Sequence, residues 1–507
     1  MVIDCASDGS GAAKPKVTVI VVGGGLAGLT ATITSARLGY RVLLIDGEAN
    51  LGGNSAKASS GINGCNTTTQ ENLGITDNTE TFFADTMSAG DHQNDPLLVD
   101  VLVEKSADAV RWLIKEGVDL TDINLSGGHS TPRTHWIPSP KEGRPIPVGV
   151  EIIRRLKTTI ESLRETRGAE ITILSSTEVT KLITEPAGKR IRVAGVECRD
   201  KTSGETKSFT KDIAAVILAT GGYSNDRTSD SLLEEFAPDK VQYPTTNGPF
   251  ATGSGAKMAR EIGAALVGME YVQLHPTGFV DPKDPTATTK FLAAEALRGK
   301  GAILVNDRGA RFANELGRRD YLTDKILKEC AKNSVANAHV AYLLMNDAAA
   351  DAFGRPAFNF YSTIKGFFKE YDNLDAAVSE CKFDMKTMVS SVNLYNEASD
   401  EGGRADAFGK TVFPVQYHVN EKLYVAQVTP SIHYSMGGLK INEHAQVLSA
   451  ADSKPIIGLY AAGEVTGGVH GSNRLAGNSL LECVVFGQIA AQSVKTHNEK
   501  IRKTDEL

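Results

Sequence analysis

Short apolar runs and helical apolar spacing alternate at the start of the chain. The β-branched run Val17–Val22 is typical of a buried parallel strand. Leu26–Leu38 repeats apolar residues at helical spacing, Gly39 ends that helix, and Arg41–Ile45 has the pattern of a second strand. The glycines of Gly23–Gly28 form the turn between the first strand and the helix. Together these segments predict one βαβ unit.

Helices and then strands are predicted between residues 97 and 222. Helical spacing marks Leu97–Lys115, closed by a glycine, and Val148–Arg167. Three strand-like segments separated by turn signals follow: Ile171–Thr184, Ile191–Cys198 and Glu205–Lys211. Ala214–Leu218 is typical of another buried strand, and it ends in Ala219–Gly222. We therefore expect an antiparallel β insert between two parts of one parallel sheet.

The pattern changes beyond about Tyr243. Strands become rarer and charged helices more common, as in Tyr321–Asn337 and Lys386–Ala398. From about Val428 the glycine-rich pattern of short strands returns. This predicts a first domain made of residues 16–243 and 428–507, with residues 244–427 inserted as a second domain. Residues 1–15 are polar and are predicted to be a disordered lead-in.

Composition and charge exclude some function classes. The 507 residues are 41% apolar and 23% charged, as in an ordinary soluble globular protein. The net charge of −7 argues against a nucleic-acid-binding surface, which would be basic. No apolar stretch approaches the roughly 18 residues of a membrane span. The six cysteines contain no CxxC or CxxCH spacing, so we expect reduced, inert thiols and no metal or haem site.

The ends of the chain give weak signals about the compartment. The N-terminus lacks the charged and apolar regions of a signal peptide, although a targeting peptide could have been removed. The C-terminal KTDEL resembles the ER-retention ending KDEL but has Thr where that signal has Lys. We expect a cytoplasmic or organellar protein, with the ER and the mitochondrion as alternatives.

The turn Gly23–Gly28 fits the dinucleotide-binding pattern GxGxxG. Gly23 permits the tight turn, Gly25 lets the backbone approach a pyrophosphate, and Gly28 allows close packing of helix on strand. The helix N-terminus offers N–H groups and a positive dipole to the phosphates. Asp46, at the end of the next strand, is placed to accept hydrogen bonds from ribose hydroxyls.

Further glycine-rich strand ends indicate which dinucleotide is bound. Leu51–Asn54 follows the acid, Ala219–Gly222 ends a later strand, and Ala462–Glu464 lies near the end of the chain. Three such ends around one cofactor favour an extended FAD. A second complete GxGxxG unit for a nicotinamide is absent from the sequence. The motif alone leaves FAD and NAD open.

Many motifs in one order carry a family resemblance. They are GGGLAGLTATI, LGGNSAKASSGIN, ILATGGY, ATGSGAKMAREIGA, QLHPTGF, AEALRGKGAILVN, RFANELGRRD, SIHYSMGGLKI and GEVTGGVHGSNRLAGNSL. From about residue 16 to 495 the chain resembles the flavoprotein subunits of fumarate reductase and succinate dehydrogenase, and most of all the soluble fumarate reductases. The resemblance implies an α/β fold: a Rossmann-like FAD-binding domain, with a parallel sheet and an antiparallel β insert, and an inserted α+β capping domain.

The resemblance also implies roles for individual residues. Arg319 matches the proton donor, and Glu295 and Arg298 match two members of a proton relay. His275, Thr277, His433 and Arg474 match ligands of the substrate. The implied FAD-binding residues are Gly23, Gly25, Leu26, Ala27, Gly28, Asp46, Gly53, Asn54, Ser55, Ser60, Gly61, Ala219, Thr220, Gly221, Glu464, Asn478 and Leu480.

The chemistry of fumarate reduction is compatible with these roles. A C4 dicarboxylate needs cationic or N–H donors at both ends, and an arginine such as Arg474 can bind a carboxylate bidentately. Hydride transfer from flavin N5 builds carbanion-like charge on the other alkene carbon, which held cations stabilise. Arg319 would protonate that carbon, and Glu295 between two arginines could reprotonate it.

Simpler interpretations of the same residues stay open at this point. Each histidine alone could be structural, and Glu295 with Arg298 could be a surface pair. The arginines at 308, 311, 318 and 319 could form a solvated basic face. Two other functions are also open: an FAD-dependent enoate reductase or dehydrogenase with another unsaturated substrate, such as a steroid enone, and a non-catalytic flavin redox sensor.

Departures from the family pattern refine these expectations. Ala294 stands where the family often has Thr, so one polar contact to substrate is missing. Asn54 appears where membrane-complex relatives carry the histidine that binds FAD covalently, so FAD is expected to be non-covalent. Those relatives also carry a C-terminal helical domain that docks on an iron–sulfur subunit, whereas this sequence ends soon after the FAD-binding domain, so we expect no iron–sulfur subunit. The acid after the second strand is Asp46 rather than the usual Glu. The electron donor, a reduced flavin or a reductase, is unidentified.

Overall fold

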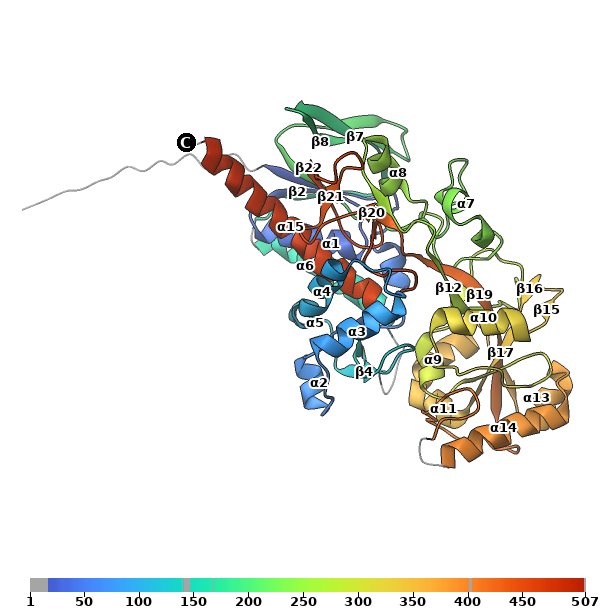
Figure 1. Ribbon diagram of the computed structural model, residues 1–507. Helices are drawn as coiled ribbons and strands as arrows, with labels where there is room; N and C mark the ends of the chain where they lie inside the picture. Colours follow the sequence, from blue (N-terminus) through green and yellow to red (C-terminus); the bar gives the residue numbers. More distant parts are fainter. Residues whose placement is uncertain (1–16, 139, 141–145, 167, 401–403, 506–507) are drawn as a thin grey trace, which may run out of the picture.

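A parallel sheet flanked by helices forms the first part of the molecule (Figure 1). This computed structural model describes residues 17–505 except 139, 141–145, 167 and 401–403. Within them, the main sheet has the strand order β6-β2-β1-β10-β22-β8-β7, with β21 beside β22 and β9 beside β8. Its strands are β1 (Thr18–Val22), β2 (Arg41–Ile45), β6 (Ile171–Leu174), β7 (Thr177–Ala187), β8 (Arg190–Asp200), β9 (Thr206–Phe209), β10 (Ile213–Leu218), β21 (Gln446–Leu448) and β22 (Pro455–Ala461).

The helices of this part pack around the sheet. They are α1 (Leu26–Arg37), α2 (Thr68–Asn72), α3 (Thr79–Ala89), α4 (Pro96–Glu104), α5 (Ser106–Lys115), α6 (Val148–Thr166), α7 (Leu232–Phe236), α8 (Ser254–Glu261) and α15 (Asn478–Asp505), with the short 3-10 turns η1 (Gly53–Lys57) and η2 (Pro238–Lys240). Small sheets are formed by β3 (Ile62–Asn63), β4 (Asp122–Asn124) and β5 (Thr134–Trp136), and by β11 (Leu266–Val267), β20 (Gly438–Lys440) and β23 (Thr466–Gly467).

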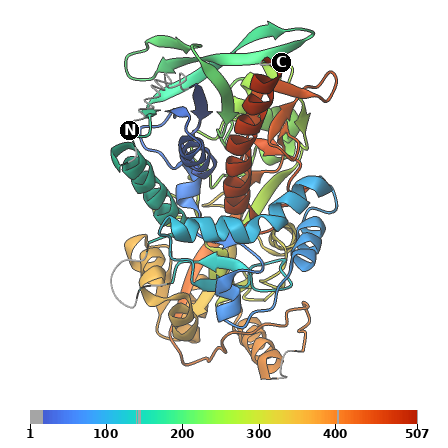
Figure 2. The same cartoon turned by 90° about the vertical axis from the view of Figure 1, so that its left-hand side faces the viewer.

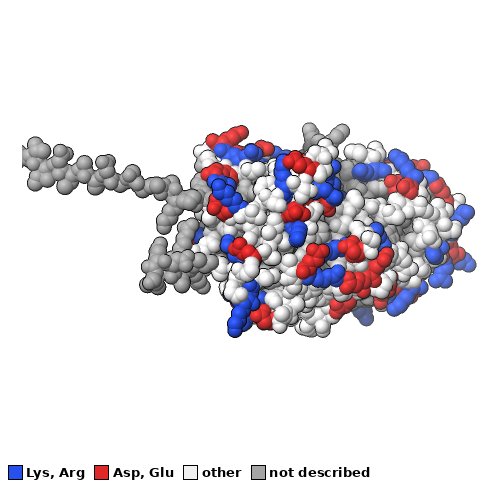
Figure 3. Space-filling model, turned by 90° about the horizontal axis from the view of Figure 1, so that it is seen from above, with Lys and Arg blue, Asp and Glu red and all other residues white. Residues whose placement is uncertain are grey.

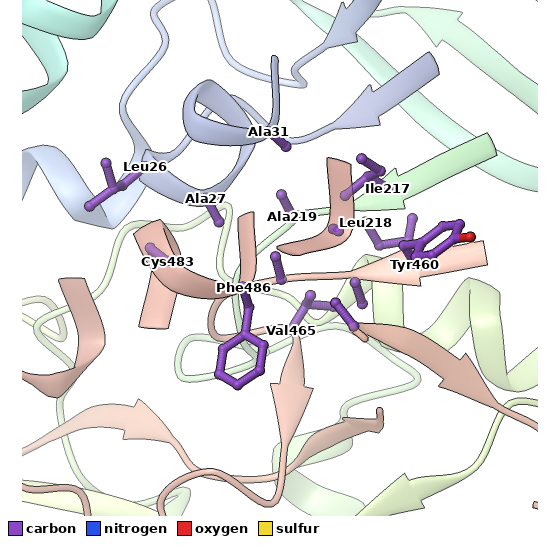
Figure 4. Close-up of a cluster of buried hydrophobic side chains, with 14 of the residues drawn as sticks. Leu26, Ala27, Ala31, Ile217, Leu218, Ala219, Tyr460, Val465, Cys483 and Phe486 are labelled. Atoms are coloured by element: carbon purple, nitrogen blue, oxygen red, sulfur yellow. The ribbon is translucent and has the colours of Figure 1, made fainter. Parts of the chain in front are cut away.

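The βαβ unit predicted at the start of the chain is confirmed. β1 pairs in parallel with β2 on one side and with β10 on the other. α1 packs against the long helix α15, where a Cβ on Gly487 would lie 2.8 Å from the Ala27 carbonyl oxygen. Figure 4 shows the surrounding core, to which α1, β10, β22 and α15 all contribute buried side chains. Burial of this apolar surface is what holds the nucleotide-binding turn in place.

Two of the predicted segments are divided in the structure. Ile171–Thr184 is not one strand: β6 joins the parallel sheet beside β2, the chain turns at Ser176 with a φ of 49°, and β7 then enters the antiparallel insert. Leu97–Lys115 is not one helix: α4 ends at Glu104, Lys105 caps it, and α5 starts at Ser106, whose Oγ accepts a hydrogen bond from the Cys65 N–H at 3.2 Å. The predicted antiparallel insert of β7, β8 and β9 is confirmed.

An antiparallel sheet with helices on it forms the second part of the molecule, which lies below the first in Figure 2. Its strands are β12 (Val272–Phe279), β13 (Phe291–Leu292), β14 (Ile303–Val305), β17 (Ala341–Asn346), β18 (Lys369–Tyr371) and β19 (Leu423–Ser435). Its helices are α9 (Glu295–Gly299), α10 (Arg319–Glu329), α11 (Asp347–Phe353), α12 (Arg355–Asn359), the π-helical turn η3 (Phe360–Ile364), α13 (Leu374–Cys381) and α14 (Met385–Asp400).

The helix predicted over Tyr321–Asn337 is shorter than expected. α10 ends at Glu329 because Cys330 is extended, and the chain continues into a hairpin of β15 (Lys332–Asn333) and β16 (Ala338–His339). The helix predicted over Lys386–Ala398 is present as α14. The mixed α/β fold class is confirmed.

The boundaries of the two expected domains stay a prediction. Residue 428 lies inside β19, which pairs with β17 and also continues along β12 toward the first part. The lead-in of residues 1–15 and the last two residues of the KTDEL ending lie outside the described residues. No helix within the described part of the chain is long and apolar enough to cross a membrane. On the face seen in Figure 3, acidic and basic side chains are interspersed.

Candidate active site

One cavity of about 450 Å³ connects the nucleotide-binding turn with three of the predicted substrate and catalytic residues. Arg319, His433 and Arg474 line it at one end. Fifteen of the predicted cofactor residues also line it: Gly23, Gly25, Leu26, Ala27, Asp46, Gly53, Asn54, Ser55, Ser60, Gly61, Ala219, Thr220, Gly221, Glu464 and Leu480. The other two do not line it: Gly28 follows the lining residue Ala27, and Asn478 lies between the lining residues Gly477 and Ser479. A cavity of this size suits a ligand that the protein encloses.

The glycine-rich turn is packed as a phosphate-binding turn requires. A Cβ on Gly23 would lie 2.2 Å from the Ala219 carbonyl oxygen, and one on Gly28 would lie 1.8 Å from the Gly23 carbonyl oxygen. A side chain at either position would therefore separate α1 from the strands. The Leu26 N–H at the start of α1 donates to Ser55 Oγ at 3.1 Å. The N-terminus of α1 thus opens on the cavity, as a site for a pyrophosphate does.

Asp46 is held by the backbone at the other end of this turn. Its Oδ2 accepts from the Gly24 N–H at 2.5 Å, and its Oδ1 accepts from the Glu48 N–H at 2.7 Å. Burial raises the pKa of Asp46 above its ordinary value. Glu48 and Lys201 line the same region and pair at 3.3 Å, although no sequence motif indicated either of them. The predicted contact of Asp46 with ribose stays a prediction.

Two further polar residues join the cofactor side of the cavity to neighbouring segments. Asn54 Oδ1 accepts from the Gly248 N–H at 3.0 Å, and its amide donates to Asn247 Oδ1. Glu464 Oε1 accepts from the Ser435 N–H at 3.0 Å, and burial raises the pKa of Glu464. Thr220 Oγ1 is buried in the cavity wall and has no hydrogen-bond partner among the described residues. The cradle and this unsatisfied hydroxyl fit a bound dinucleotide.

Arg319 projects from the first turn of α10 into a buried hydrogen-bond network. Its Nη2 donates to Glu295 Oε2 at 2.9 Å, and its Nη1 donates to Gln273 Oε1 at 2.9 Å. Gln273 Nε2 in turn donates to the carbonyl oxygen of Arg474 at 3.0 Å. Gln273 therefore fixes the spacing of two predicted site arginines. Gln273 lies in the motif QLHPTGF but was given no role from the sequence, because these contacts are with residues distant in the chain.

Glu295 is a buried carboxylate between arginines. Its side chain is 2% exposed, and its Oε1 accepts from the Gly127 N–H at 3.0 Å. Burial alone would raise the pKa of Glu295, but the charges of Arg319 and Arg298 outweigh it and lower that pKa below its ordinary value. The interpretation of Glu295 and Arg298 as a surface pair is therefore wrong.

Arg298 lies behind Glu295 on α9. One of its Nη atoms donates to the carbonyl oxygen of Glu315, while Nε and Nη2 have no partner among the described residues. Burial lowers the pKa of Arg298. The Glu315 carboxylate is held by Arg311 at 2.9 Å and by Lys410 at 3.0 Å.

These pairings also rule out a basic face made of the four neighbouring arginines. Arg308 is exposed, but Arg311 is buried in its pair with Glu315, and Arg319 is buried against Glu295. Arg318 is partly buried and pairs with Asp91 at 2.9 Å.

The two predicted histidines lie side by side, with ring centroids 5.0 Å apart. The Thr277 N–H lies 3.2 Å from His275 Nδ1, so this nitrogen is the acceptor and the neutral ring carries its proton on Nε2. That Nε2 is buried and has no partner among the described residues. His433 Nδ1 lies 2.7 Å from Thr246 Oγ1. Burial, and then the charge of Arg319, hold the pKa of both rings well below its ordinary value, so both are neutral.

Arg474 is a buried cation with unused donors. Its guanidinium lies 4.3 Å from the centroid of the Tyr434 ring, and Tyr434 donates to Glu482. Its Nη1 lies 3.4 Å from the Leu475 carbonyl oxygen, while Nε has no partner among the described residues. Burial and then the charge of Arg319 lower the pKa of Arg474 to about 9. A buried arginine with a free donor is costly unless an anion binds it.

Positive charge therefore exceeds negative charge at this end of the cavity. Arg319, Arg298 and Arg474 are all buried there, and Glu295 is the carboxylate whose pKa is lowered among them. Four predicted residues, Glu295, Arg298, His275 and Thr277, lie behind the lining rather than in it. The arrangement can hold an anion against Arg474 and His433 and can move a proton along the Arg319–Glu295 pair.

Comparisons with known proteins agree with this geometry. The model of the family described as an FAD binding domain matches residues 18–480. The fumarate reductase of Schizosaccharomyces pombe is 40% identical over 94% of this chain and 89% of its own length. Fumarate reductase 1 of Saccharomyces cerevisiae is 37% identical over 94% of this chain and 98% of its own length.

Solved structures show the same fold. The open conformation of a flavocytochrome c3 fumarate reductase superimposes with a TM-score of 0.72 at 33% identity, over 96% of this chain and 79% of that chain. A 3-ketosteroid-Δ4-(5α)-dehydrogenase from Rhodococcus jostii RHA1 superimposes with a TM-score of 0.67 at 23% identity, over 95% of this chain and 97% of that chain. The second likeness concerns the fold alone.

Proposed function

Because this chain belongs to the FAD-binding flavoprotein family of the fumarate reductases and succinate dehydrogenases, we propose that it reduces fumarate to succinate. One observation carries the proposal: a single cavity is lined by a dinucleotide-binding turn and by the buried, incompletely paired Arg474 together with Arg319. The reaction adds a hydride to one alkene carbon and a proton to the other.

FAD is the cofactor for which the cavity is suited. The residues from Gly23 to Ala27, Asp46, Thr220 and Glu464 would hold it, and when bound it would supply the hydride. We further propose that FAD binds without a covalent bond, since residues 51–61 contain no histidine.

The substrate is held at two ends. Arg474 binds one carboxylate through its free Nε and its Nη groups, and His433 lines the cavity at the same end as a further contact for the substrate. His275, whose Nε2–H is unsatisfied, and Thr277 contribute at the other carboxylate. Binding the anion also offsets the cost of burying Arg474 without a counter-charge.

Arg319 is the proton donor in this proposal. It lines the cavity, and its guanidinium is already bonded to the Glu295 carboxylate, which can return a proton to it. An arginine is a poor acid in water, but the substrate carbon that receives the proton is far more basic than water. Arg298, with two free nitrogens beside Glu295, continues the path.

The surroundings of this reaction are also proposals. Residues 244–427 act as a capping domain that excludes water from the site when it closes. A reduced flavin or a reductase supplies the electrons, and no iron–sulfur subunit is needed. We propose a cytoplasmic or organellar location.

The alternatives differ in the charge of the ligand. A steroid enone is neutral and would leave the buried Arg474, whose Nε has no partner among the described residues, without an anion to bind, which disfavours it. A redox sensor would not need the bonded pair of Arg319 and Glu295 in the cavity wall.

A substrate panel tests the proposal. The purified protein, loaded with FAD and supplied anaerobically with a reduced viologen, is assayed with fumarate, with the monocarboxylate crotonate and with a steroid enone. We expect turnover with fumarate, much slower turnover with crotonate and none with the steroid. Turnover of the steroid or of crotonate in preference to fumarate would refute the assignment, as would inactivity with all three.

A further inference from the structure

The carboxylate of Asp91 lies between the two segments that carry the site arginines. Its oxygens accept from Arg318 Nη1 at 2.9 Å and from Arg318 Nη2 at 3.1 Å. Its Oδ2 also accepts from Ser472 Oγ at 2.5 Å. Arg318 directly precedes Arg319, and Ser472 lies two residues before Arg474. We call Asp91, Arg318 and Ser472 the Asp91 latch.

Among the described residues, the loop that carries Asp91 forms backbone hydrogen bonds with the segment of Arg474. The Ser472 N–H donates to the Gly90 carbonyl oxygen at 3.1 Å, and the Asp95 N–H donates to the Gly468 carbonyl oxygen at 2.7 Å. Asn94 Nδ2 donates to the Val469 carbonyl oxygen at 2.9 Å. The loop is therefore joined by its backbone to the segment of Arg474, and in the described part of the chain its hydrogen bonds to the segment of Arg319 are made by the side chain of Arg318.

The guanidinium of Arg318, at the start of α10, donates hydrogen bonds to several groups. Besides Asp91, it donates through Nη1 to the Ser88 carbonyl oxygen at 2.8 Å and through Nη2 to Asp320 Oδ2 at 2.9 Å. Asp320 lies in the first turn of α10, where a negative charge is favourable at a helix N-terminus. The latch therefore fixes both the side chain of Arg318 and the helical turn from which Arg319 projects.

We propose that the Asp91 latch positions Arg319 relative to Arg474, and that it thereby sets the rate of the proton-donating step. Arg318 and Asp91 are positioning residues, since neither lines the cavity. Displacements of about 1 Å at a reacting group can slow a reaction up to about a hundredfold, so a latch next to the proton donor affects the rate more than it affects binding. Its kinetic consequence rests on the proposed reduction of fumarate.

A double-mutant cycle tests the latch. The single variants Asp91→Asn and Arg318→Gln and the double variant are compared with the FAD-loaded wild type for kcat and KM with fumarate. We expect each single variant to lose up to about fivefold in kcat, the range of one exposed charge pair, with a smaller change in KM. The double variant should be no slower than either single variant, because the two residues act through one contact.

Asp108→Asn is the matched control. Asp108 is 58% exposed and pairs with Arg111 on α5, much as Asp91 at 54% exposed pairs with Arg318, but no site residue adjoins it. The kcat of the Asp108→Asn variant should equal that of the wild type. A wild-type kcat in Asp91→Asn, or full additivity of the two single effects, would overturn the latch.

Amide hydrogen exchange separates the latch from the proposed function. In Asp91→Asn we expect faster exchange at the first turn of α10 and no change in α5, whether or not fumarate is the substrate. If the wild type does not reduce fumarate, the proposed function fails and exchange alone decides: faster exchange in α10 supports the latch, and unchanged exchange overturns it.

Discussion

Replacing Glu295 by Gln probes the carboxylate at the centre of the site. Its Oε2 accepts from Arg319 Nη2 at 2.9 Å and from Nε at 3.3 Å, while its Oε1 accepts from the Gly127 N–H. A glutamine keeps the shape but has one acceptor oxygen. Its NH₂ group must therefore face either the guanidinium of Arg319 or the N–H of Gly127, and in both cases two donors meet.

The Glu295→Gln variant should lose both catalytic rate and folding stability. The variant cannot return a proton to Arg319, and loss of a general acid–base group lowers kcat by about 10²–10⁴-fold. It also leaves Arg319 and Arg298 buried without their carboxylate, and breaking a buried pair in this way costs about 3–5 kcal/mol of folding free energy. The second loss alone would not slow the chemistry of molecules that remain folded.

Glu315→Gln is the control that separates the two losses. Glu315 is equally buried and pairs with Arg311 and Lys410, but its carboxylate does not contact Arg319. We expect both variants to lose comparable stability in denaturant unfolding, and Glu295→Gln alone to show the large loss of kcat in anaerobic viologen assays at a temperature where both are folded. A Glu295→Gln variant with wild-type kcat, or with no greater loss than Glu315→Gln, would refute the proton-return role.

Three further predictions follow from the same network. Arg319→Ala should abolish turnover while the flavin absorbance of bound FAD is retained; near-native turnover would contradict the proton-donor role. Arg474→Met should weaken fumarate binding to the oxidised protein by about 2–5 kcal/mol, which is roughly a 30-fold or larger rise in the Kd measured by flavin absorbance titration. The same variant should lose no stability, because it removes a buried charge that is incompletely paired. In the wild type, burial would raise the pKa of Glu315, but the charges of Lys410 and Arg311 outweigh burial and lower that pKa to about 2. The ionised Glu315 should therefore stabilise the fold fully above its ordinary pKa of 4.5, and this stabilisation should be lost as the pH falls toward 2. The difference in unfolding free energy between wild type and Glu315→Gln should shrink over that range. A difference that stays constant there would contradict the pairing.

Local sequence signals were sufficient for the nucleotide-binding turn. Three neighbouring signals were enough to predict the βαβ unit around Gly23–Gly28: a β-branched run, a glycine turn and a helix closed by Gly39. The divided segments depend on distant partners instead. Nothing in the periodicity of Ile171–Thr184 shows that its first half pairs with β2 and its second half with β8, and the turn at Ser176 follows from that difference.

In the candidate active site, too, some residues could be assigned from motifs and others only from tertiary contacts. Arg319, His433 and Arg474 were identified from motifs, and the fold brings them to one cavity. Gln273 and Tyr434, which contact the two arginines, lie in the motifs QLHPTGF and SIHYSMGGLKI but were given no role from the sequence. Their roles arise from tertiary contacts between segments up to about 200 residues apart, and neither residue type at these positions indicates a function by itself.

Reoxidation of the reduced flavoprotein by fumarate tests the central claim most directly. The FAD-loaded protein is reduced by one equivalent of dithionite without oxygen, mixed with fumarate, and followed by flavin absorbance while succinate is quantified. We predict that the oxidised flavin spectrum returns with one succinate formed per FAD in the wild type, and that Arg319→Ala stays reduced. A wild-type flavin that stays reduced in the presence of fumarate, or that reoxidises without forming succinate, would contradict the account.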